Sequence, residues 1–289
     1  KHFALLSGLI VSLGMLGAIC GGAPLAYFVY HTSWQSSLLM LSGVGVVLAL
    51  VLYLFIRDYP ADQQAHFEAH YDETLSGLKS ILKSKQSWLG AIYGSLMYAP
   101  TIAFAALWGV PSLVASHGLE RHSAAFIVSL IFAGWAFGGP IFGWLSDHTG
   151  KRKPALVIAN IAAFILFSLV IYLPAPVWVI GVLLFIYGFF LSGFLVVFSL
   201  VREINPMRYS ATSIGFVNTL NMLGGAIAQP LIGKILDATD KSHTVIKHTV
   251  VYSAHSYAIA LAVLPLLLLL ATLCLPWIKE SYCGSRRGD

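Results

Sequence analysis

Charged residues and cysteines are both scarce in this chain. Asp, Glu, Lys and Arg make up only 10% of the 289 residues, whereas hydrophobic residues make up 58% and the mean hydropathy is +0.80. These proportions exclude an ordinary soluble domain and indicate a chain that lies in lipid. The three cysteines, Cys20, Cys274 and Cys283, have no spacing typical of a metal site or a disulfide framework.

The sequence also lacks the motifs of several functional classes. It contains no G-x-x-x-x-G-K-[ST] loop, which excludes ATP-driven transport within this chain. No catalytic or metal-binding constellation lies inside an apolar stretch, and none of the ten histidines has metal-ligand spacing there. We therefore expect no enzyme, no metal and no cofactor. The basic residues form no continuous stripe despite a pI near 9.1, so we expect no nucleic-acid partner.

Long apolar stretches are what the chain has in abundance. A bilayer core about 30 Å thick needs about 20 apolar helical residues. Residues 264–270 do not alternate polar and apolar side chains, which excludes a membrane β-barrel. We predict an all-α membrane protein with eight transmembrane helices, near residues 3–30, 37–56, 88–114, 124–145, 155–173, 178–200, 211–236 and 254–277.

The distribution of Lys and Arg over the loops predicts the orientation in the membrane. When loops are assigned alternately to two sides, all but four of the 17 basic residues fall on one side; the four exceptions are Arg121, Lys234, Lys241 and Lys247. Because basic loops stay in the cytoplasm, both termini are predicted to be cytoplasmic, in what we expect to be a bacterial inner membrane. Residues 58–87 form a cytoplasmic linker with an amphipathic helix, and residues 281–289 form a cytoplasmic tail.

An internal repeat indicates how the helices are grouped. Residues 13–25 read LGMLGAICGGAPL, and residues 220–231 read LNMLGGAIAQPL, so the first and seventh stretches correspond. The repeat unit is therefore six helices, as in many transporters. On this interpretation residues 1–57 are the last two helices of a truncated N-terminal six-helix bundle, and residues 88–280 form a complete C-terminal bundle. Chance similarity between two glycine-rich membrane helices is the alternative.

The loop at residues 143–154 reads GWLSDHTGKRKP, between two apolar stretches. Its basic run resists translocation, whereas an acid at position 147 has no explanation in hydropathy and indicates a specific partner. The pattern resembles the loop signature of the major facilitator superfamily, with His148 where that family usually has Arg or Lys. The residues that carry the resemblance are Gly143, Asp147, Gly150, Lys151, Arg152 and Lys153.

This resemblance implies that the eight stretches correspond to the fifth through twelfth helices of that family. It also implies that the loop is a conformational gate. The carboxylate of Asp147 would meet the positive end of a neighbouring helix or a nearby Arg, and the repeat symmetry places that neighbour at residues 1–6. The alternative is a solvated acid that merely follows a helix.

Small residues recur at three- and four-residue spacing, as expected where membrane helices pack closely. The predicted packing positions are Gly17, Gly21, Gly22, Gly138, Gly224 and Gly225. The segment around residues 17–22 is also a candidate hinge or seal between bundles. It has Ala18 where the antiporter signature of the family has Pro, which weakens the interpretation as a drug exporter.

Amides and aromatic residues are the candidates for a substrate cavity, because no charged residue lies well inside any stretch. Asn218, Asn221 and Gln229 lie within about 80° of one another on a helix. They form either a cavity wall or hydrogen bonds between helices. Tyr93, Thr101 and Trp108 follow one stripe of the third stretch and line either the same cavity or a packed interior.

The sequence therefore predicts a secondary active transporter of a small polar organic solute, such as a nutrient, an amino acid, a peptide or an organic acid. Its partners would be the lipid bilayer and the solute, and coupling to a proton is left open. A non-transporting receptor or assembly factor that keeps the bundle is the alternative from another class. A drug or metabolite exporter is the alternative within the family.

Overall fold

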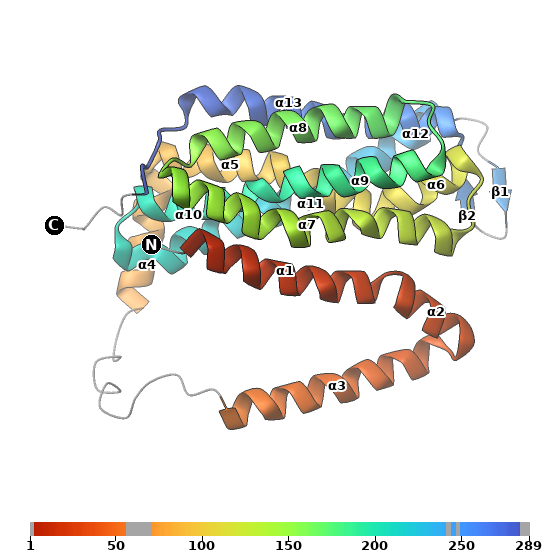
Figure 1. Ribbon diagram of the computed structural model, residues 1–289, viewed down its shortest axis with the longest axis horizontal. Helices are drawn as coiled ribbons and strands as arrows, with labels where there is room; N and C mark the ends of the chain where they lie inside the picture. The colour runs from red at the N-terminus through yellow and green to blue at the C-terminus, as the bar shows by residue number, and fades with distance from the viewer. Residues whose placement is uncertain (1–2, 56–70, 241–243, 247–248, 284–289) are drawn as a thin grey trace.

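The computed structural model describes residues 3–55, 71–240, 244–246 and 249–283, with no side-chain description for residues 3–8, 71–74, 244–246, 249–251 and positions 23, 26 and 30. Figure 1 shows an elongated helical bundle with a short hairpin at one end. The α4 end carries α4 (Tyr71–Lys83) and the loop between α7 (Arg121–Thr149) and α8 (Lys153–Tyr172). The hairpin end carries β1 (Thr244–Ile246) and β2 (Thr249–Val251), which pair antiparallel.

Six rods run between these two ends. Two are the uninterrupted α7 and α8, and a third is α11 (Ser210–Thr239). The other three are composite: α5 (Lys85–Pro100), η2 (Thr101–Trp108) and α6 (Gly109–His117); α9 (Val177–Leu191), η3 (Ser192–Leu195) and α10 (Val196–Ile204); and α12 (Ala254–Leu261), α13 (Val263–Cys274) and η5 (Leu275–Trp277). A short turn, η4 (Met207–Tyr209), leads into α11.

The last six predicted stretches, from residue 88 to residue 277, correspond to these rods. Within the described part of the chain, six helical segments are long and apolar enough to cross a membrane: 34–55, 85–117, 121–149, 153–172, 177–204 and 254–277. The 30-residue α11 is also long enough at about 1.5 Å per residue, although it is less apolar. The chain is thus a helical membrane protein as expected, with the small addition of the hairpin between α11 and α12.

The first predicted helix is interrupted. The helix α1 (Phe3–Gly21) ends before Pro24, and α2 (Ala23–His31) continues in a new direction. Pro24 accounts for the start of α2, because a proline ring lacks a backbone donor and suits the first turn of a helix, where no donor is needed. A second proline, Pro100, precedes the π-helical segment η2, where the regular hydrogen-bond ladder is shifted by one residue.

One side of the six-rod bundle is covered by α1, which packs along α7. The hydroxyl of Ser12 donates to the carbonyl of Ala136 at 2.7 Å. Beyond α1, α3 (Trp34–Phe55) runs back toward the α4 end and stands apart from the bundle in Figure 1. Its apolar side chains are mostly exposed, as expected for a membrane helix that faces lipid or further helices.

Glycine allows the closest helix contact, between α7 and α9. A Cβ atom on Gly138 would lie 2.2 Å from the carbonyl oxygen of Phe189, and on Gly188 it would lie 2.1 Å from that of Ile131. On α11, a Cβ on Gly224 or Gly225 would collide with α5 or η2. By contrast, a Cβ on Gly17 or Gly21 would meet nothing within 4 Å, and Gly22 has only loose neighbours. Among the described residues, Gly17 and Gly21 therefore make no close helix contact, and their packing role stays a prediction.

Within the predicted linker, only residues 71–87 are described, and residues 58–70 lie outside the described part of the chain. The helix α4 packs on η4. A Cβ on Gly77 would lie 2.6 Å from the ring of Tyr209, and Ile81 is fully buried. On the other face, Leu75 and Leu82 remain exposed, so α4 is anchored by one edge at the end of the bundle.

Candidate functional site

The loop between α7 and α8 closes around one buried arginine. After Thr149 the chain turns at Gly150, whose φ of 65° is left-handed and suits glycine. This turn directs Arg152 back into the protein, where only 3% of the side chain is exposed. Its Nη1 donates to Asp147 Oδ1 at 2.6 Å and to Ser146 Oγ at 2.9 Å.

The second carboxylate bound by Arg152 comes from a distant rod. The guanidinium of Arg152 meets Glu203, near the end of α10, in a two-pronged contact: Nε donates to Oε2 at 3.2 Å and Nη2 to Oε1 at 2.5 Å. Two parallel charge-assisted bonds fix both the distance and the plane of the pair. Burial alone would lower the pKa of Arg152, but the bonds to Glu203 and Asp147 outweigh it and raise the pKa. The guanidinium is therefore charged at every physiological pH.

A C-terminal strap, residues 276–283, holds this network from outside. The carboxylate of Glu280 accepts the backbone N–H of Arg152 at 2.7 Å and of Lys153 at 2.8 Å, and so caps the start of α8. The hydroxyl of Ser281 donates to Glu203 Oε2 at 2.5 Å. The side-chain amide of Gln86, at the start of α5, donates to the carbonyl of Trp277 and accepts from the backbone N–H of Lys279 in the strap. We call Asp147, Arg152, Glu203, Glu280 and Ser281 the Arg152 network.

The structure thus brings together two of the loop residues predicted from sequence, Asp147 and Arg152. Gly143 is buried in α7, Lys151 is exposed, and Lys153 donates to the carbonyl of Pro276 at 3.2 Å. The predicted neighbour at residues 1–6 lies outside the described side chains, although Figure 1 shows α1 beginning beside the last turns of α7. The sequence analysis missed Glu203 and Glu280, whose only signal was an acid at the end of an apolar stretch.

The amides of α11 form a second polar region, along the contact with α5 and η2. Asn221 is 1% exposed and faces Gly94, where a Cβ atom would lie 2.9 Å from Asn221 Oδ1. Its amide nitrogen and oxygen have no hydrogen-bond partner among the described residues. Asn218, one turn earlier, is exposed. An unsatisfied buried amide is costly, so Asn221 has hydrogen-bonding capacity available to a solute or water.

The other predicted cavity residues bind neighbouring helices. The amide of Gln229 donates to Ile102 O at 3.1 Å, and its own backbone carbonyl accepts from Trp108 Nε1 at 3.1 Å. Tyr93 is fully buried, and its hydroxyl donates to the carbonyl of Leu156 at 2.9 Å. Thr101 is buried in η2. These contacts agree with the alternative that Gln229, Trp108 and Tyr93 hold neighbouring helices together.

An aromatic cluster between α5, η3 and α7 was not recognised from sequence. The ring of Tyr98 on α5 stacks on Phe194 of η3, with centroids 5.1 Å apart, and Trp135 of α7 packs against the same ring at 5.2 Å. Tyr98 is partly exposed, whereas the buried indole N–H of Trp135 has no partner among the described residues. The cluster joins three rods, so only the folded bundle reveals it.

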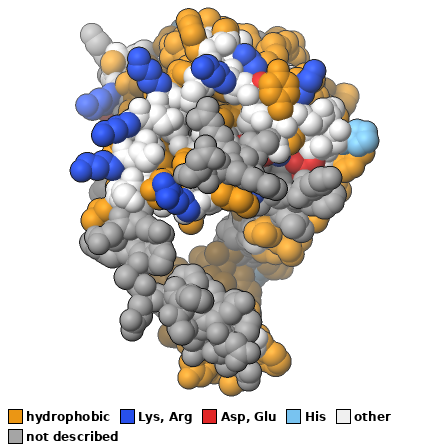
Figure 2. Space-filling model, turned by 90° about the vertical axis from the view of Figure 1, so that its left-hand side faces the viewer, with side chains coloured by type: hydrophobic (Ala, Val, Ile, Leu, Met, Phe, Trp, Pro, Cys, Tyr) orange, Lys and Arg blue, Asp and Glu red, His pale blue; other side chains and the backbone are white. Residues whose placement is uncertain are grey.

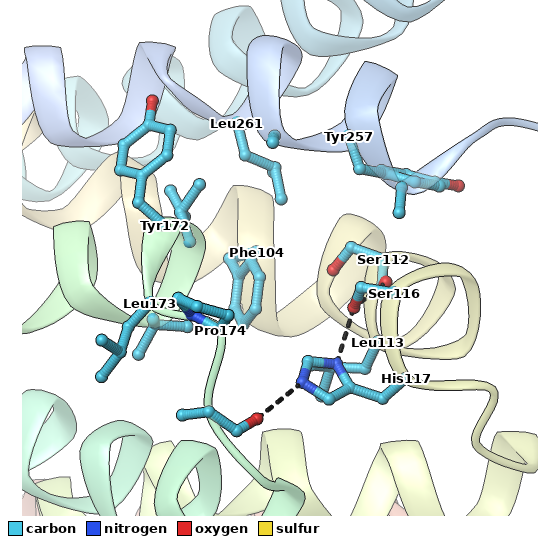
Figure 3. Close-up of a pocket in the computed structure, with 15 residues that line it drawn as sticks. Phe104, Ser112, Leu113, Ser116, His117, Tyr172, Leu173, Pro174, Tyr257 and Leu261 are labelled. Carbon is cyan, nitrogen blue, oxygen red and sulfur yellow. Dashed lines mark hydrogen bonds between the residues drawn. The ribbon is translucent and has the colours of Figure 1, made fainter.

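The hairpin end contains a cavity of about 470 Å³ between the end of α6, the turn from α8 to α9, and α12. Figure 3 shows its mostly apolar lining, with His117 at its edge. His117 Nδ1 lies 2.7 Å from Ser116 Oγ, and Nε2 lies 3.3 Å from the carbonyl of Ala175. The imidazole thereby ties the end of α6 to the α8–α9 turn. The described residues contain no group of three potential metal ligands.

Comparison with known proteins identifies relatives of the chain. The family model described as Major Facilitator Superfamily matches residues 1–229. A probable hexose phosphate transport protein of Chlamydia trachomatis is 24% identical over 239 residues, which cover 71% of this chain and 51% of that protein.

Two further relatives match shorter segments of the chain. A probable hexose phosphate transport protein of Chlamydia pneumoniae is 31% identical over 137 residues, 45% of this chain and 30% of that protein. The human lysosomal dipeptide transporter MFSD1 is 26% identical over 207 residues, 69% of this chain and 43% of that protein. The chain thus spans about half the length, or less, of these three relatives.

Proposed function

Because the chain belongs to the major facilitator superfamily, we propose that it is the part of a secondary active transporter that corresponds to the fifth through twelfth helices of the family. The transporter moves a small polar organic solute by alternating access and is not an enzyme. The family match and the relatives named as transporters support this proposal. The observation that carries it is the Arg152 network, a buried charge cluster at a loop between membrane helices.

The proposed solute is a nutrient, an amino acid, a peptide or an organic acid. Two relatives are named for hexose phosphate and dipeptide, both polar organic solutes. From this chain, we infer that Asn221 and the exposed Asn218 contact the solute, because the Asn221 amide has unused donors and an unused acceptor among the described residues. Tyr98 on α5 presents a partly exposed aromatic face.

The Arg152 network is the proposed gate. Asp147 lies at the end of α7, the helix on which α1 packs, while Glu203 and Glu280 belong to α10 and the strap. A shift of α1 along α7 would therefore act on the Asp147–Arg152 bond first. A charge pair that is made in one arrangement and weakened in another biases the equilibrium between the two states.

The proposed orientation places the α4 end in the cytoplasm of a bacterial cell, with both termini on that side of the inner membrane. Figure 2 looks onto the α4 end and shows Lys and Arg side chains gathered on it. Besides the buried Arg152, the described basic residues of this end are Lys79, Lys83, Lys85, Lys151, Lys153, Arg202, Arg208 and Lys279. Basic loops of this kind favour retention in the cytoplasm.

A counterflow assay tests the proposed function. Proteoliposomes that contain the purified protein are loaded with one unlabelled solute from a panel of dipeptides, amino acids, organic acids and hexose phosphates, and entry of the labelled solute is measured. Transient accumulation of one class supports the transporter, and repetition with an imposed pH gradient tests a coupling proton. A folded protein that exchanges no member of the panel would favour the receptor or assembly factor instead.

Asn221 and Asn218 can be tested in the same assay. Asn221→Ala should raise the half-saturating concentration of the exchanged solute by about tenfold, as expected for the loss of about 1.4 kcal/mol of binding. Gln229→Ala is the matched control, because that amide is already bonded to Ile102. A loss of folded protein in Asn221→Ala, with unchanged transport per molecule, would assign the amide to helix packing.

A further inference from the structure

A groove at the α4 end lies between the start of α8 and the C-terminal strap. Its volume is about 660 Å³, and it is open on one side. Lys151, Lys153 and Lys279 belong to its lining. Lys151 and Lys279 are exposed, the first in the loop before α8 and the second in the strap. The groove has no part in the proposed binding of the solute.

The charge of the groove is positive. Glu280 is the one acid among its lining residues, and the two backbone N–H groups that open α8 already bind its carboxylate. Lys153 gives one of its three ammonium hydrogens to Pro276 O and retains two. Three cations against one internally satisfied carboxylate leave a net charge of about +2, which suits an anionic group.

The apolar part of the groove continues along α8. Val157 and Ile158 follow Lys153, and Ile158, about 7 Å farther along the helix at 1.5 Å per residue, is 51% exposed. On the strap, two residues line the groove: Ile278, which is buried, and Tyr282, which is 69% exposed. Exposed Trp277 and Trp144 lie at the same end, as aromatic side chains do at a membrane interface.

We propose that this groove binds the headgroup phosphate of an anionic phospholipid, with the acyl chains lying along α8. A ring of ammonium groups above an apolar helix face matches the two parts of such a lipid, and basic pockets between membrane helices are suited to anionic headgroups. In the proposed orientation, the lipid belongs to the cytoplasmic leaflet. The site does not depend on the transport activity, since it requires only that the bundle lies in a membrane.

The site has a consequence for the strap. The phosphate would bridge Lys151 of the loop and Lys279 of the strap, two segments that Glu280 already joins. Bound lipid should therefore stabilise the strap against the loop. The protein should be more resistant to heat with the anionic lipid than with a zwitterionic lipid of the same chains.

Native mass spectrometry of the purified, delipidated protein in detergent tests the proposal. Phosphatidylglycerol and phosphatidylcholine with identical acyl chains are titrated separately, and bound lipid is counted. We expect tighter binding of phosphatidylglycerol and a higher melting temperature with it. The variant Lys151→Gln/Lys153→Gln/Lys279→Gln should lose at least about tenfold of this affinity, given the contribution of each basic residue near an anionic headgroup.

The control Lys79→Gln/Lys83→Gln/Lys85→Gln removes the same charge from the same end of the bundle, on α4 and the start of α5. It should keep the preference for phosphatidylglycerol. A second variant, Lys151→Glu/Lys279→Glu, leaves the Lys153 bond to Pro276 intact and should lose the preference without loss of the fold.

Three results would overturn the proposal. Equal loss in the groove variant and in the control would mean a diffuse basic surface. Equal affinity for the two lipids would mean no anion site. Competition by millimolar inorganic phosphate as effective as that by the lipid would mean that a soluble anion, and not a phospholipid, is the ligand.

Discussion

The two ends of the bundle are held by different forces. At the α4 end, Arg152 is 3% exposed and its two carboxylate partners are 10% and 12% exposed. At the hairpin end, His122 Nδ1 lies 3.2 Å from Glu120 Oε2, and these side chains are 71% and 79% exposed. Cavities of about 470 and 1070 Å³ lie there as well. Buried charges persist only when their partners are fixed, whereas exposed pairs contribute little. The α4 end is therefore held by a buried cluster of opposite charges. At the hairpin end the buried carboxylate, Asp240, is held by neutral donors, the backbone N–H of Ser253 and the hydroxyl of Ser256.

Of the variants considered, Arg152→Met should cause the largest loss of stability. The variant keeps a long side chain but leaves Asp147 and Glu203 without their shared cation, so the free energy of unfolding should fall by about 3–5 kcal/mol. Thermal unfolding in detergent measures the change. Glu120→Gln, at the hairpin end, should change it by less than about 1 kcal/mol. Similar losses in both variants would show that the two ends do not differ.

A moderate effect is expected from Glu280→Gln. The amide retains one acceptor oxygen for the start of α8 but loses the charge that favours a helix N-terminus, which should cost about 0.5–2 kcal/mol. Limited proteolysis of the strap, together with the melting temperature, checks this expectation. Lys79→Gln, an exposed change on α4, is the control. Proteolysis at the control rate would mean that Glu280 does not hold the strap.

At the hairpin end, His117→Ala should have a smaller effect. The variant removes the contacts of the imidazole with Ser116 and Ala175, and one or two hydrogen bonds near the surface are worth about 0.5–1.5 kcal/mol. Hydrogen exchange in the α8–α9 turn should become faster, while exchange in the strap stays unchanged. Faster exchange in both segments would show that the two ends are coupled.

The smallest effect concerns the pH dependence of stability at the hairpin end. The hydrogen bond from Tyr252 to Asp237, together with partial burial and nearby charges, raises the pKa of this phenol from 10.0 to about 12. Because the protonated form is favoured in the folded state, its contribution is complete below pH 10 and is lost as the pH rises to about 12. In Tyr252→Phe, the free energy of unfolding should no longer fall across this pH range. An unchanged profile would contradict the assignment.

The rods could be predicted from the sequence because length and apolar composition are local properties. The stretch predicted at residues 254–277 has these bounds in the structure, and the stretch predicted at residues 155–173 corresponds to α8. Pro24 predicts a kink in the first stretch, but the sequence does not say whether a proline bends a membrane helix or begins a new one, as it does at α2.

The site was predictable only where its partners are neighbours in sequence. Asp147 and Arg152 share one loop and were both recognised. Glu203 and Glu280 meet them only through the packing of α10 and the strap, which no local pattern encodes. For the same reason, Gly17 looked like Gly138 in the sequence, although only Gly138 faces a neighbouring backbone. Helical periodicity assigns side chains to a face, but tertiary packing decides what that face meets.

The most direct test of the central claim, that the Arg152 network sets the rate of alternation, is the counterflow kinetics of Asp147→Asn in the intact protein. A hydrogen bond to a charged group, as between Arg152 and Asp147, is worth about 1.5–3 kcal/mol, and its loss would shift a two-state equilibrium by about tenfold or more. The account predicts an altered turnover with a nearly unchanged half-saturating concentration. Unchanged turnover at normal expression would contradict it, and the loop would then serve only to anchor the topology.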